Sequence, residues 1–347
     1  MKFLLYISYD YGFPIVRPLQ EEILKRGDEV AWFIEIEESK KKIQSSENLL
    51  NTVQEVFDFK PDAVLVACNE VPHFFPGIKV QLFHGFSVNK RSEEKGHFRI
   101  RGFFDLYCTQ GPSTTEHFQE LAAKHKYFEV VETGWSKVDV LFPIEEKNEL
   151  DKPTIFFAST FTERLSLAHN NAVFNELESI IKTEDWNWII NLHPKMSEEI
   201  VQKFKRLTKY KNVTYIPFLE DLASLKLADV MLTDTSSIIT EFIIQKKPVV
   251  TFKNNKPKTC FINSTNVDQI KPSIEKALEY PVDLMEKIEA YVLMEHPYFD
   301  GKSSIRVIDV TIAFLEKDRS YLKRKPLNLF RKYQMRKKMN YWNLKKI

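Results

Sequence analysis

Hydroxyl, imidazole and ammonium groups follow apolar, strand-like runs at three places in the chain. At the first, Asp234, Thr235, Ser236 and Ser237 follow the run 230–233, and a helical pattern begins at Ser236. The first turn of a helix has unpaired backbone N–H groups and the positive end of the helix dipole, so it can bind an anion. This pattern favours a phosphate ligand. The alternative is structural, with Asp234 or Thr235 only capping the helix.

The second place is the sequence NLHPK, where His193 and Lys195 follow the apolar run 188–192. Pro194 ends the strand and favours an extended backbone at His193. Both side chains can donate hydrogen bonds to a phosphate, the histidine either as a cation or as a neutral N–H donor. Two carboxylates near the first place, Asp234 and Glu241, either bind a ribose or have a structural role.

The third place is the sequence LFHGFS, where His84 and Gly85 follow the run 79–83. Histidine is the side chain whose ordinary pKa best suits proton abstraction near neutral pH. Gly85 would let the backbone turn sharply and let a ligand approach. A structural histidine at a strand end is the alternative. No Cys/His cluster suggests zinc and no carboxylate cluster implies a catalytic metal, so neither a metal nor a cofactor is expected.

These residues must be positioned by strands and helices that the sequence also predicts. Apolar, β-branched runs alternate with helical patterns, which is typical of α/β folds with parallel sheets. The predicted strands are 3–8, 30–34, 63–67, 79–83, 106–109, 128–132, 154–158, 188–192, 213–216, 230–233 and 249–252, with helices such as 14–26 and 112–124 between them.

The scheme restarts after the charged, proline-bounded segment 142–153, which indicates a linker. We therefore expect two Rossmann-like, doubly wound domains facing a cleft, an N-terminal acceptor-side domain over 1–145 and a C-terminal donor-binding domain over 150–318. In open α/β sheets, ligands bind beyond the carboxyl ends of the strands. Polar residues that directly follow strands therefore carry the functional prediction.

The composition excludes several classes of protein. Hydrophobic residues make up 43% of the 347 residues, which supports sizeable cores and excludes a disordered chain. Only 9 residues are glycine, which argues against Gly-rich dinucleotide loops. The widely spaced Cys68, Cys108 and Cys260 favour reduced thiols in a cytosolic protein. No run is long and apolar enough to predict a membrane span.

The segment 319–347 forms a basic, aromatic tail. From Lys323 onward it contains ten Lys or Arg residues and no Asp or Glu, which leaves about −8 on the preceding 322 residues. Basic and aromatic residues at helical spacing fit attachment of 323–347 to the anionic inner face of a cell membrane. A solvated terminal helix is the alternative. Nucleic acid is not an expected partner, because the rest of the chain is acidic.

Several segments together resemble a known family. They are FHGFS at 83–87, FFASTF at 156–161, LHPK at 192–195, the long segment 228–252 and DGKSSIRVIDV at 300–310. In this order they resemble the bacterial CDP-glycerol glycerophosphotransferases, the teichoic-acid primase and polymerase family. The resemblance covers roughly 80–315 and is most specific from DVMLTD to PVVTF. Thr235 stands where that family usually has tyrosine, and Ser159 where it has proline.

The resemblance implies a GT-B fold and transfer of glycerol phosphate from CDP-glycerol to a hydroxyl acceptor, with release of CMP. It implies that His84 is the candidate base on the acceptor side, while His193, Ser236 and Ser237 hold the donor diphosphate. The acceptor is expected to be a cell-surface glycan or a lipid-linked saccharide. Two alternatives stay open: a GT-B glycosyltransferase that uses a UDP- or CMP-linked sugar, and a non-catalytic nucleotide-binding protein.

Overall fold

The computed structural model describes residues 1–86, 96–144, 151–217 and 222–343. Ser87 of the FHGFS segment, positions 145–150 of the predicted linker and the end of the tail, 344–347, lie outside these described residues. The chain forms two compact units. Unit 1 comprises Met1–Asp139 and Asp300–Ile347, and unit 2 comprises Val140–Phe299.

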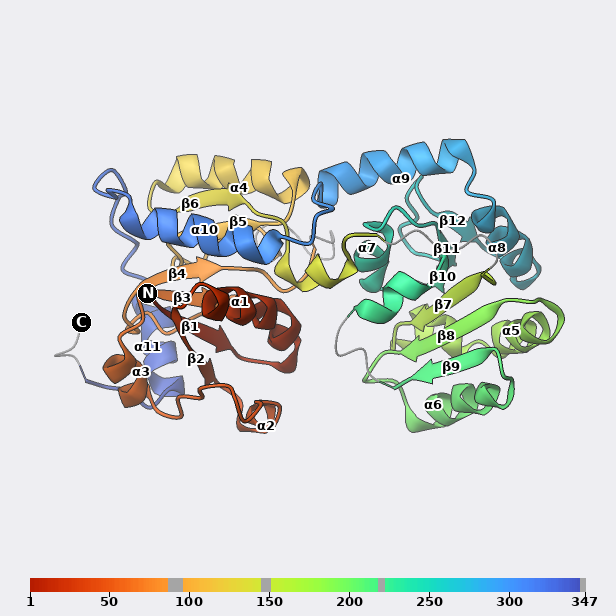
Figure 1. Cartoon of the computed structure of the whole chain (residues 1–347), viewed down its shortest axis with the longest axis horizontal. Helices are drawn as coiled ribbons and strands as arrows, with labels where there is room; N and C mark the ends of the chain where they lie inside the picture. Colours follow the sequence, from red (N-terminus) through yellow and green to blue (C-terminus); the bar gives the residue numbers. More distant parts are fainter. Residues whose placement is uncertain (87–95, 145–150, 218–221, 344–347) are drawn as a thin grey trace. The chain divides into compact units, whose positions relative to one another are not determined.

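Unit 1 contains a six-stranded sheet in the order β2-β1-β3-β4-β5-β6 (Figure 1). Its strands, all paired in parallel, are β1 (Lys2–Ile7), β2 (Glu29–Ile34), β3 (Ala63–Val66), β4 (Ile78–Gln81), β5 (Leu106–Thr109) and β6 (Glu129–Glu132). Residues 3–7 of β1 are completely buried. This burial explains the unbroken apolar run in the sequence, because helices cover parallel sheets on both faces.

The helices of unit 1 cover the two faces of this sheet. They are α1 (Phe13–Lys25), α2 (Glu37–Lys40), α3 (Val53–Phe59), α4 (Pro112–His125), α10 (Ser303–Glu316) and α11 (Leu329–Lys338). On one face, Val56 of α3, Phe118 of α4 and Met335 of α11 join a single core with the strands. On the other face α1 packs against α10, as Figure 1 shows.

Unit 2 contains a second six-stranded parallel sheet, with the order β12-β11-β10-β7-β8-β9. Its strands are β7 (Thr154–Ser159), β8 (Asn187–Leu192), β9 (Val213–Ile216), β10 (Val230–Thr233), β11 (Val249–Phe252) and β12 (Ile262–Ser264). Counted within the unit this is the order 3-2-1-4-5-6 typical of dinucleotide-binding folds. The chain leaves β7 toward β8 and later returns to β10 on its other side, so the order reverses between β7 and β10.

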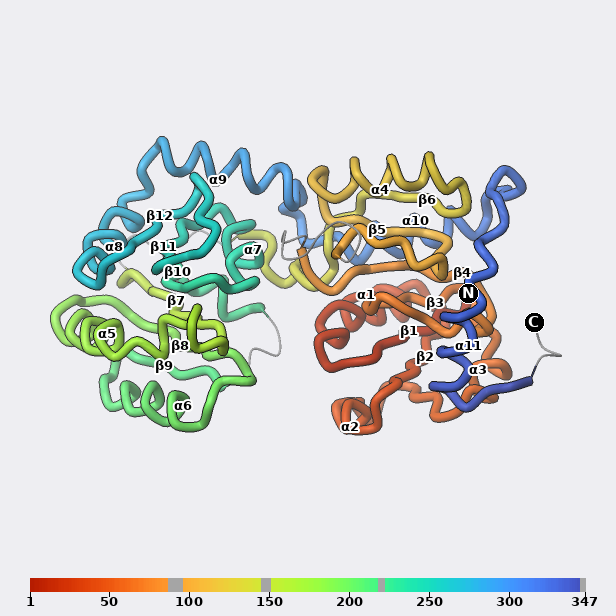
Figure 2. Tube along the Cα trace, turned by 180° about the vertical axis from the view of Figure 1, so that it is seen from behind, coloured from red at the N-terminus to blue at the C-terminus, as the bar shows by residue number. Residues whose placement is uncertain are grey.

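The helices of unit 2 also lie on both faces of its sheet, as the tube in Figure 2 shows from behind. They are α5 (Asn171–Thr183), α6 (Glu198–Lys205), α7 (Ile238–Ile243), α8 (Ile270–Leu278) and α9 (Val282–Glu295). Leu177 of α5, Phe204 of α6 and Ile274 of α8 share one buried core with the strands. Helix α7 packs against α9.

The units differ from the predicted domain boundaries at the C-terminal side. The prediction placed residues up to 318 in the C-terminal domain, whereas α10 belongs to unit 1. Helix α10 buries Val307, Ile308 and Phe314, and it packs against α1. Its sequence position after unit 2 gave no sign of this, because the packing partner lies near the start of the chain.

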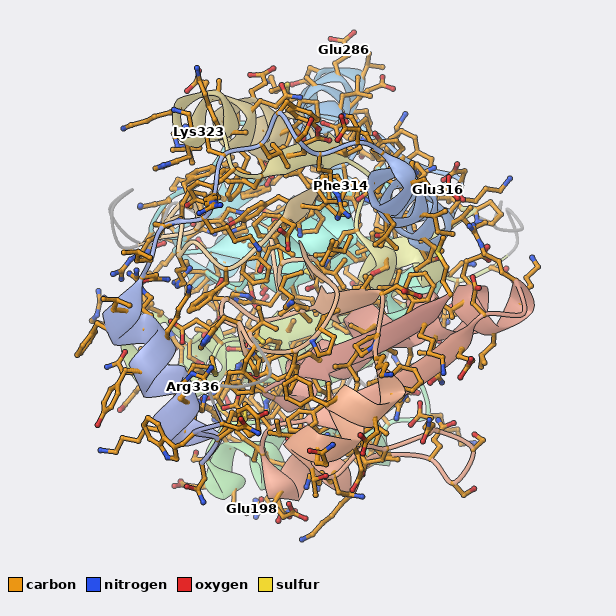
Figure 3. All side chains as sticks on the ribbon, turned by 90° about the vertical axis from the view of Figure 1, so that its left-hand side faces the viewer. Glu198, Glu286, Phe314, Glu316, Lys323 and Arg336 are labelled. Atoms are coloured by element: carbon orange, nitrogen blue, oxygen red, sulfur yellow. The ribbon has the colours of Figure 1, made fainter. Side chains whose placement is uncertain are left out.

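The tail is docked on unit 1 through one side of α11. Met335 is 3% exposed and belongs to the unit 1 core, and Tyr341 stacks on Phe57 with ring centroids 5.4 Å apart. Figure 3 labels Lys323 and Arg336, which lie along this segment. The other side of the tail exposes Leu327 and Phe330, which are 74% and 72% exposed. Within the described residues, no helix has the length and hydrophobicity that crossing a bilayer requires.

Candidate functional site

The candidate site of unit 2 lies where the carboxyl ends of three neighbouring strands meet. Strand β7 pairs with β10 on one side and with β8 on the other. Ligands of open α/β sheets bind where the strand order reverses, because loops leave the two strands in opposite directions there. The predicted residues after β8 and β10 therefore flank the end of β7. This is the switch point of the sheet.

Asp234 ties the end of β10 to the end of β7. The Ser159 hydroxyl donates to Oδ2 of Asp234 at 2.7 Å, and the backbone N–H groups of Thr160 and Leu167 donate to the same carboxylate at 3.0 and 3.1 Å. Asp234 has no exposed surface. Burial raises its pKa, although these donors oppose the effect. Of the two roles considered for Asp234, the geometry supports the structural one.

The hydroxyls after Asp234 lie nearer the surface. Thr235 and Ser236 are half-buried and Ser237 is exposed. Oγ1 of Thr235 accepts a hydrogen bond from the backbone N–H of Asn255 at 3.2 Å. Helix α7 begins at Ile238, two residues later than predicted, and is only six residues long. Glu241 lies in its first turn and is half-buried.

His193 and Lys195 leave β8 next to the same strand end. The backbone N–H of His193 donates to the carbonyl of Ser159 at 3.3 Å. The ring of Phe161, which follows β7, lies 4.5 Å from the His193 ring, and Nζ of Lys195 lies 5.8 Å from the centre of the Phe161 ring. Phe161 therefore links the side chains of His193 and Lys195 to the end of β7, where Asp234 accepts its hydrogen bonds.

The geometry around His193 indicates which nitrogen carries its proton. The backbone N–H of Lys195 donates to Nδ1 of His193 at 3.0 Å. A neutral ring that accepts at Nδ1 has its hydrogen on Nε2, so His193 presents an N–H donor there. Partial burial lowers its pKa, and the charge of Lys195 adds to this effect. Both observations favour the neutral donor over the cation.

His84 belongs to unit 1 and lies beside residues that follow β1. Strand β4 ends at Gln81, so His84 is three residues beyond the strand and not directly after it as predicted. Its ring centroid is 5.3 Å from that of Tyr11. Crowding by protein atoms lowers the pKa of His84, and the positive charge of Arg101 adds to this shift. His84 is exposed to solvent, and its lowered pKa favours the basic form at neutral pH.

Gly85 does not make the turn that was predicted for it. The positive φ angle in this motif belongs to Phe83, at 59°. A Cβ atom at position 85 would meet no heavy atom within 4 Å, so the backbone there does not require glycine. The left-handed conformation is instead held by packing of the buried Phe83 ring against His97 and Phe118, with centroids 4.9 and 5.0 Å apart.

Two aromatic residues of these sites were missed by the sequence analysis. Tyr11 contacts His84, and Phe161 contacts His193. Both follow predicted strands, so the rule that selected the histidines could also have selected them. Within the described residues, no group of three His, Cys, Asp or Glu side chains could hold a metal ion.

Comparison with solved structures identifies the fold. A variant of the wall teichoic acid polymerase TagF has a TM-score of 0.67 and 14% identity, covering 91% of this chain and 89% of that chain. UDP-GlcNAc 2-epimerase from Neisseria meningitidis, bound to UDP-GlcNAc, has 0.63 and 16%, with coverage of 90% and 100%. S. aureus MnaA with UDP has 0.62 and 17%, with coverage of 94% and 98%. At these identities the likeness shows the fold alone, which is the expected GT-B fold.

Sequence comparison gives a narrower result. None of the curated proteins matches the chain. A family model described as UDP-N-acetylglucosamine 2-epimerase matches residues 112–312, which is more than half of the chain. This stretch begins with α4, includes the whole of unit 2 with the switch point around Asp234, and ends within α10. The chain therefore belongs to the UDP-N-acetylglucosamine 2-epimerase family.

Proposed function

We propose that this chain is an enzyme that binds the diphosphate of a nucleotide-linked substrate at the switch point of unit 2. The main support is the position of the donor groups. His193 and Lys195 follow β8, Thr235–Ser237 follow β10, and these two strands lie on either side of β7. They offer an imidazole N–H, an ammonium group and hydroxyls. Asp234 has no exposed surface, and its carboxylate accepts hydrogen bonds from Ser159, Thr160 and Leu167. Donors without an exposed carboxylate among them suit an anion.

The first candidate reaction is transfer of glycerol phosphate, or a related alditol phosphate, from a CDP-linked donor. The acceptor hydroxyl oxygen attacks the β-phosphorus while His84 takes its proton. The bond from that phosphorus to the bridging oxygen breaks, and CMP leaves with the electron pair. His193, Lys195 and the hydroxyls stabilise the phosphate oxygens, at about 2.7–4 kcal/mol for a well-placed donor. General-base help of this kind contributes about 10²–10⁴-fold.

The second candidate is chemistry on a nucleotide sugar, and the family match favours it. The family model that matches residues 112–312 is that of UDP-N-acetylglucosamine 2-epimerase. One similar structure contains UDP-GlcNAc and another contains UDP. In this case the same donor groups bind the diphosphate, but the bond that breaks joins the sugar carbon to the diphosphate oxygen. The nucleotide leaves with the electron pair, and in a glycosyltransferase the acceptor hydroxyl oxygen forms the new bond to that carbon.

A panel of nucleotide donors separates these candidates. The full chain is incubated with CDP-glycerol, CDP-ribitol, UDP-GlcNAc and a CMP-sugar, and the released nucleotide and the remaining sugar are identified by chromatography and mass spectrometry. Release of CMP from a CDP-alditol supports the first candidate. Release of UDP, or conversion of UDP-GlcNAc to an epimer, supports the second. If no donor is bound or consumed, the proposal of a nucleotide-diphosphate enzyme fails.

The acceptor of the first reaction would be a hydroxyl of a cell-surface glycan or of a lipid-linked saccharide. The tail would hold the enzyme on the inner face of the membrane as a peripheral protein. Its exposed side carries Leu327, Leu329 and Phe330, and the exposed Lys337 lies with the last two on α11. Apolar and basic groups on one docked helix suit an anionic interface.

A further inference from the structure

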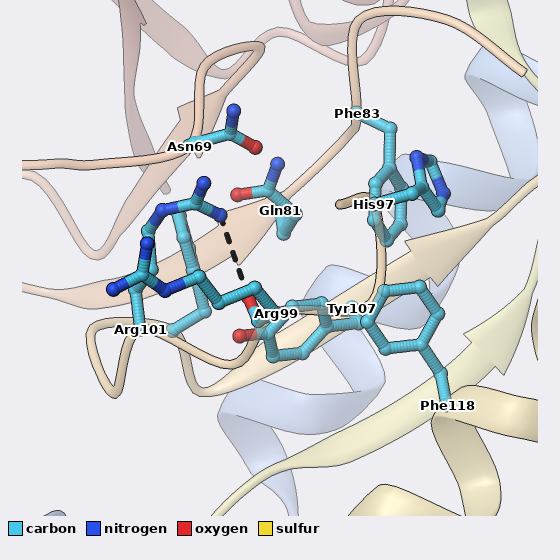
Figure 4. A pocket seen from close by; sticks show the side chains of 9 residues that line it. Asn69, Gln81, Phe83, His97, Arg99, Arg101, Tyr107 and Phe118 are labelled. Carbon is cyan, nitrogen blue, oxygen red and sulfur yellow. Dashed lines mark hydrogen bonds between the residues drawn. The ribbon is translucent and has the colours of Figure 1, made fainter. Parts of the chain in front are cut away.

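Unit 1 has a hollow lined by cationic and amide side chains, shown in Figure 4. Its polar lining consists of Asn69, Gln81, His97, Arg99, Arg101 and Tyr107. The rest of the lining is aromatic. No carboxylate is among the lining residues, all of which lie in the described ranges. Two guanidinium groups without a lining carboxylate make the hollow electrostatically suited to an anion.

The two arginines have unused hydrogen-bonding capacity. Figure 4 shows both guanidinium groups on the side of the hollow where Asn69 and Gln81 lie. Arg101 donates one long hydrogen bond, 3.4 Å, to the carbonyl oxygen of Arg99, and neither arginine forms an ion pair within the described residues. Burial lowers the pKa of Arg101; the carboxylate of Glu70 opposes the shift and the charge of Arg99 adds to it. An anion placed between the two groups would relieve this cost.

Gln81 places a buried, unpaired polar atom in the lining of the hollow. Its side chain, at the end of β4, is only 2% exposed, and its Oε1 atom accepts no hydrogen bond within the described residues. Nε2 of His97, on another wall of the hollow, is also buried and unpaired there. Buried polar groups are nearly always paired, and these two atoms line the same hollow, so a ligand with its own donors and acceptors would pair both of them.

The hollow adjoins both His84 and the tail. Phe83 lines it and directly precedes His84, and the charge of Arg101 reaches the His84 ring. On the other side, Nδ2 of Asn328 donates to the carbonyl oxygen of Arg101 at 2.7 Å. Leu327 and Leu329, the neighbours of Asn328, are 74% and 70% exposed. Arg101 therefore lies between His84, the candidate base, and the exposed apolar side of the tail.

We propose that this hollow binds a phosphate ester of the acceptor, with Arg99 and Arg101 on the phosphate oxygens and Gln81 on a neighbouring hydroxyl. This inference rests on the proposed function, because it names the acceptor class of the same reaction. The phosphate ester is either the headgroup of a lipid or part of a soluble molecule. The exposed leucines beside Asn328 suit the lipid, and vesicle binding separates the two sources.

The first test measures binding of glycerol phosphate and of inorganic phosphate by calorimetry. Arg99→Gln and Arg101→Gln are compared with Lys25→Gln, which removes one exposed positive charge from the end of α1 without touching the hollow. We expect affinity to fall about ten- to a hundredfold in the two arginine variants and to stay unchanged in Lys25→Gln. Arg99 is exposed, so its variant also answers the question if Arg101→Gln does not fold. Equal affinity in wild type and Arg99→Gln would overturn the proposal.

A second variant separates binding from packing. Gln81→Leu replaces an unpaired buried amide by an apolar side chain of similar size. If Gln81 serves a ligand, this variant raises the midpoint of thermal unfolding of the ligand-free protein and weakens glycerol phosphate binding. If Gln81 only supports the fold, the midpoint falls and the affinity is unchanged, which would contradict its assigned role.

Vesicles distinguish the two sources of phosphate. Co-sedimentation is measured with phosphatidylcholine vesicles that contain or lack phosphatidic acid. Binding that needs phosphatidic acid, is displaced by glycerol phosphate and weakens in Leu329→Ser identifies a lipid headgroup. Binding of glycerol phosphate without vesicle binding identifies a soluble ester. The absence of both would end the proposal.

These titrations use no nucleotide donor, so they test the hollow independently of the donor panel, which tests the proposed function. Nucleotide release with unchanged phosphate affinity in Arg99→Gln would refute the hollow alone. Arginine-dependent phosphate binding without any nucleotide chemistry would refute the proposed function alone.

Discussion

His84 and His193 both lie near the carboxyl ends of parallel strands, but their surroundings give them different chemistry. Nδ1 of His193 is occupied by the Lys195 N–H, so the ring can only donate from Nε2 while it is neutral. His84 contacts the ring of Tyr11, and partial burial together with the charge of Arg101 holds its pKa below the usual value. A base that stays unprotonated at neutral pH fits His84, and a fixed donor fits His193.

At the residue scale, His84→Ala is expected to lower turnover by about a hundredfold or more, which is the usual size of general-base help. Donor binding should change little, because His84 is in unit 1 and the proposed diphosphate site is in unit 2. Steady-state kinetics and donor titration measure the two effects, with His125→Ala as a control at the end of α4. Lost donor binding with turnover retained at saturation would reverse the roles assigned to the two histidines.

The pH dependence follows from the direction of the His84 shift. Its pKa lies below the ordinary 6.5, so the neutral, basic form dominates at pH 7. The proposed activity should therefore be flat near neutral pH and fall only when the pH drops through this lowered pKa. Arg101→Gln removes one cause of the shift and should move the acidic limb of the kcat/KM profile to higher pH. An unmoved limb would show that another group sets it.

Two glycines near the strand ends should respond differently to substitution. Gly85→Ala should change the free energy of unfolding by no more than about 0.5 kcal/mol, because the new methyl group meets open space. Gly77→Ala should cost more than about 1 kcal/mol, because Gly77 has a φ of +77° and its Cβ would lie 2.4 Å from the carbonyl oxygen of Asp62. Urea unfolding of the two variants compares them. Equal losses would mean that position 85 also needs its glycine.

At the scale of elements, the attachment of α10 depends on a distant carboxylate. Asp139, from the 3₁₀ turn Ser136–Leu141, accepts the backbone N–H of Ser303 at 2.8 Å and that of Ser304 at 2.7 Å. The residue before the helix, Lys302, makes no side-chain cap. Asp139 therefore supplies the acceptor that a local N-cap residue usually supplies, and it contributes to fixing α10 in unit 1.

Asp139→Ala should lower the free energy of unfolding by about 2 kcal/mol or more, because two buried N–H groups lose their acceptor. Asp318→Ala is the matched control, since Asp318 also accepts a backbone N–H, from Ser320 at 2.9 Å, but in an exposed turn. That variant should lose less than about 1 kcal/mol. Chemical denaturation followed by circular dichroism measures both. Similar losses in the two variants would argue against the capping role of Asp139.

At the scale of the whole molecule, the tail is part of unit 1 and also its candidate membrane contact. Met335 lies in the core, and Arg336 lies over the ring of Phe74, with its guanidinium carbon 5.1 Å from the ring centre. Lys325 forms an ion pair with Asp105 at 2.7 Å. Removing the tail would therefore expose core surface of unit 1. A simple truncation cannot test membrane attachment by itself.

Deletion of 323–347 should lower the thermal stability of unit 1 strongly, since loss of a buried Met side chain alone costs about 2–5 kcal/mol. Phe330→Ser, on the exposed side of α11, should leave the unfolding midpoint unchanged and reduce partition onto anionic liposomes. Calorimetry and liposome flotation measure the two effects. If Phe330→Ser partitions like the wild type, the membrane contact assigned to this side of the tail is wrong.

Most of the fold could be predicted from the sequence. Parallel strands are buried on both faces, so they appear as short, unbroken apolar runs. Of the twelve strands in the part of the chain that the structure describes, eleven match the prediction to within about two residues. The exception is β12, because three residues, Ile262–Ser264, make no recognisable run. The histidines and hydroxyls after the strands were found by the same rule. That rule needs only local sequence.

The features that only the tertiary structure determined all depend on contacts between residues far apart in the chain. The sequence determined the strand ends and the residue types that follow them, because both are set within a few neighbouring positions. It left open whether Asp234 faces a ligand, and the structure shows it bound to Ser159 and Thr160 instead. It also gave no sign of the hollow at Arg101 or of α10 joining unit 1. Burial and pairing of polar groups arise only when distant segments pack, so no local pattern carries them.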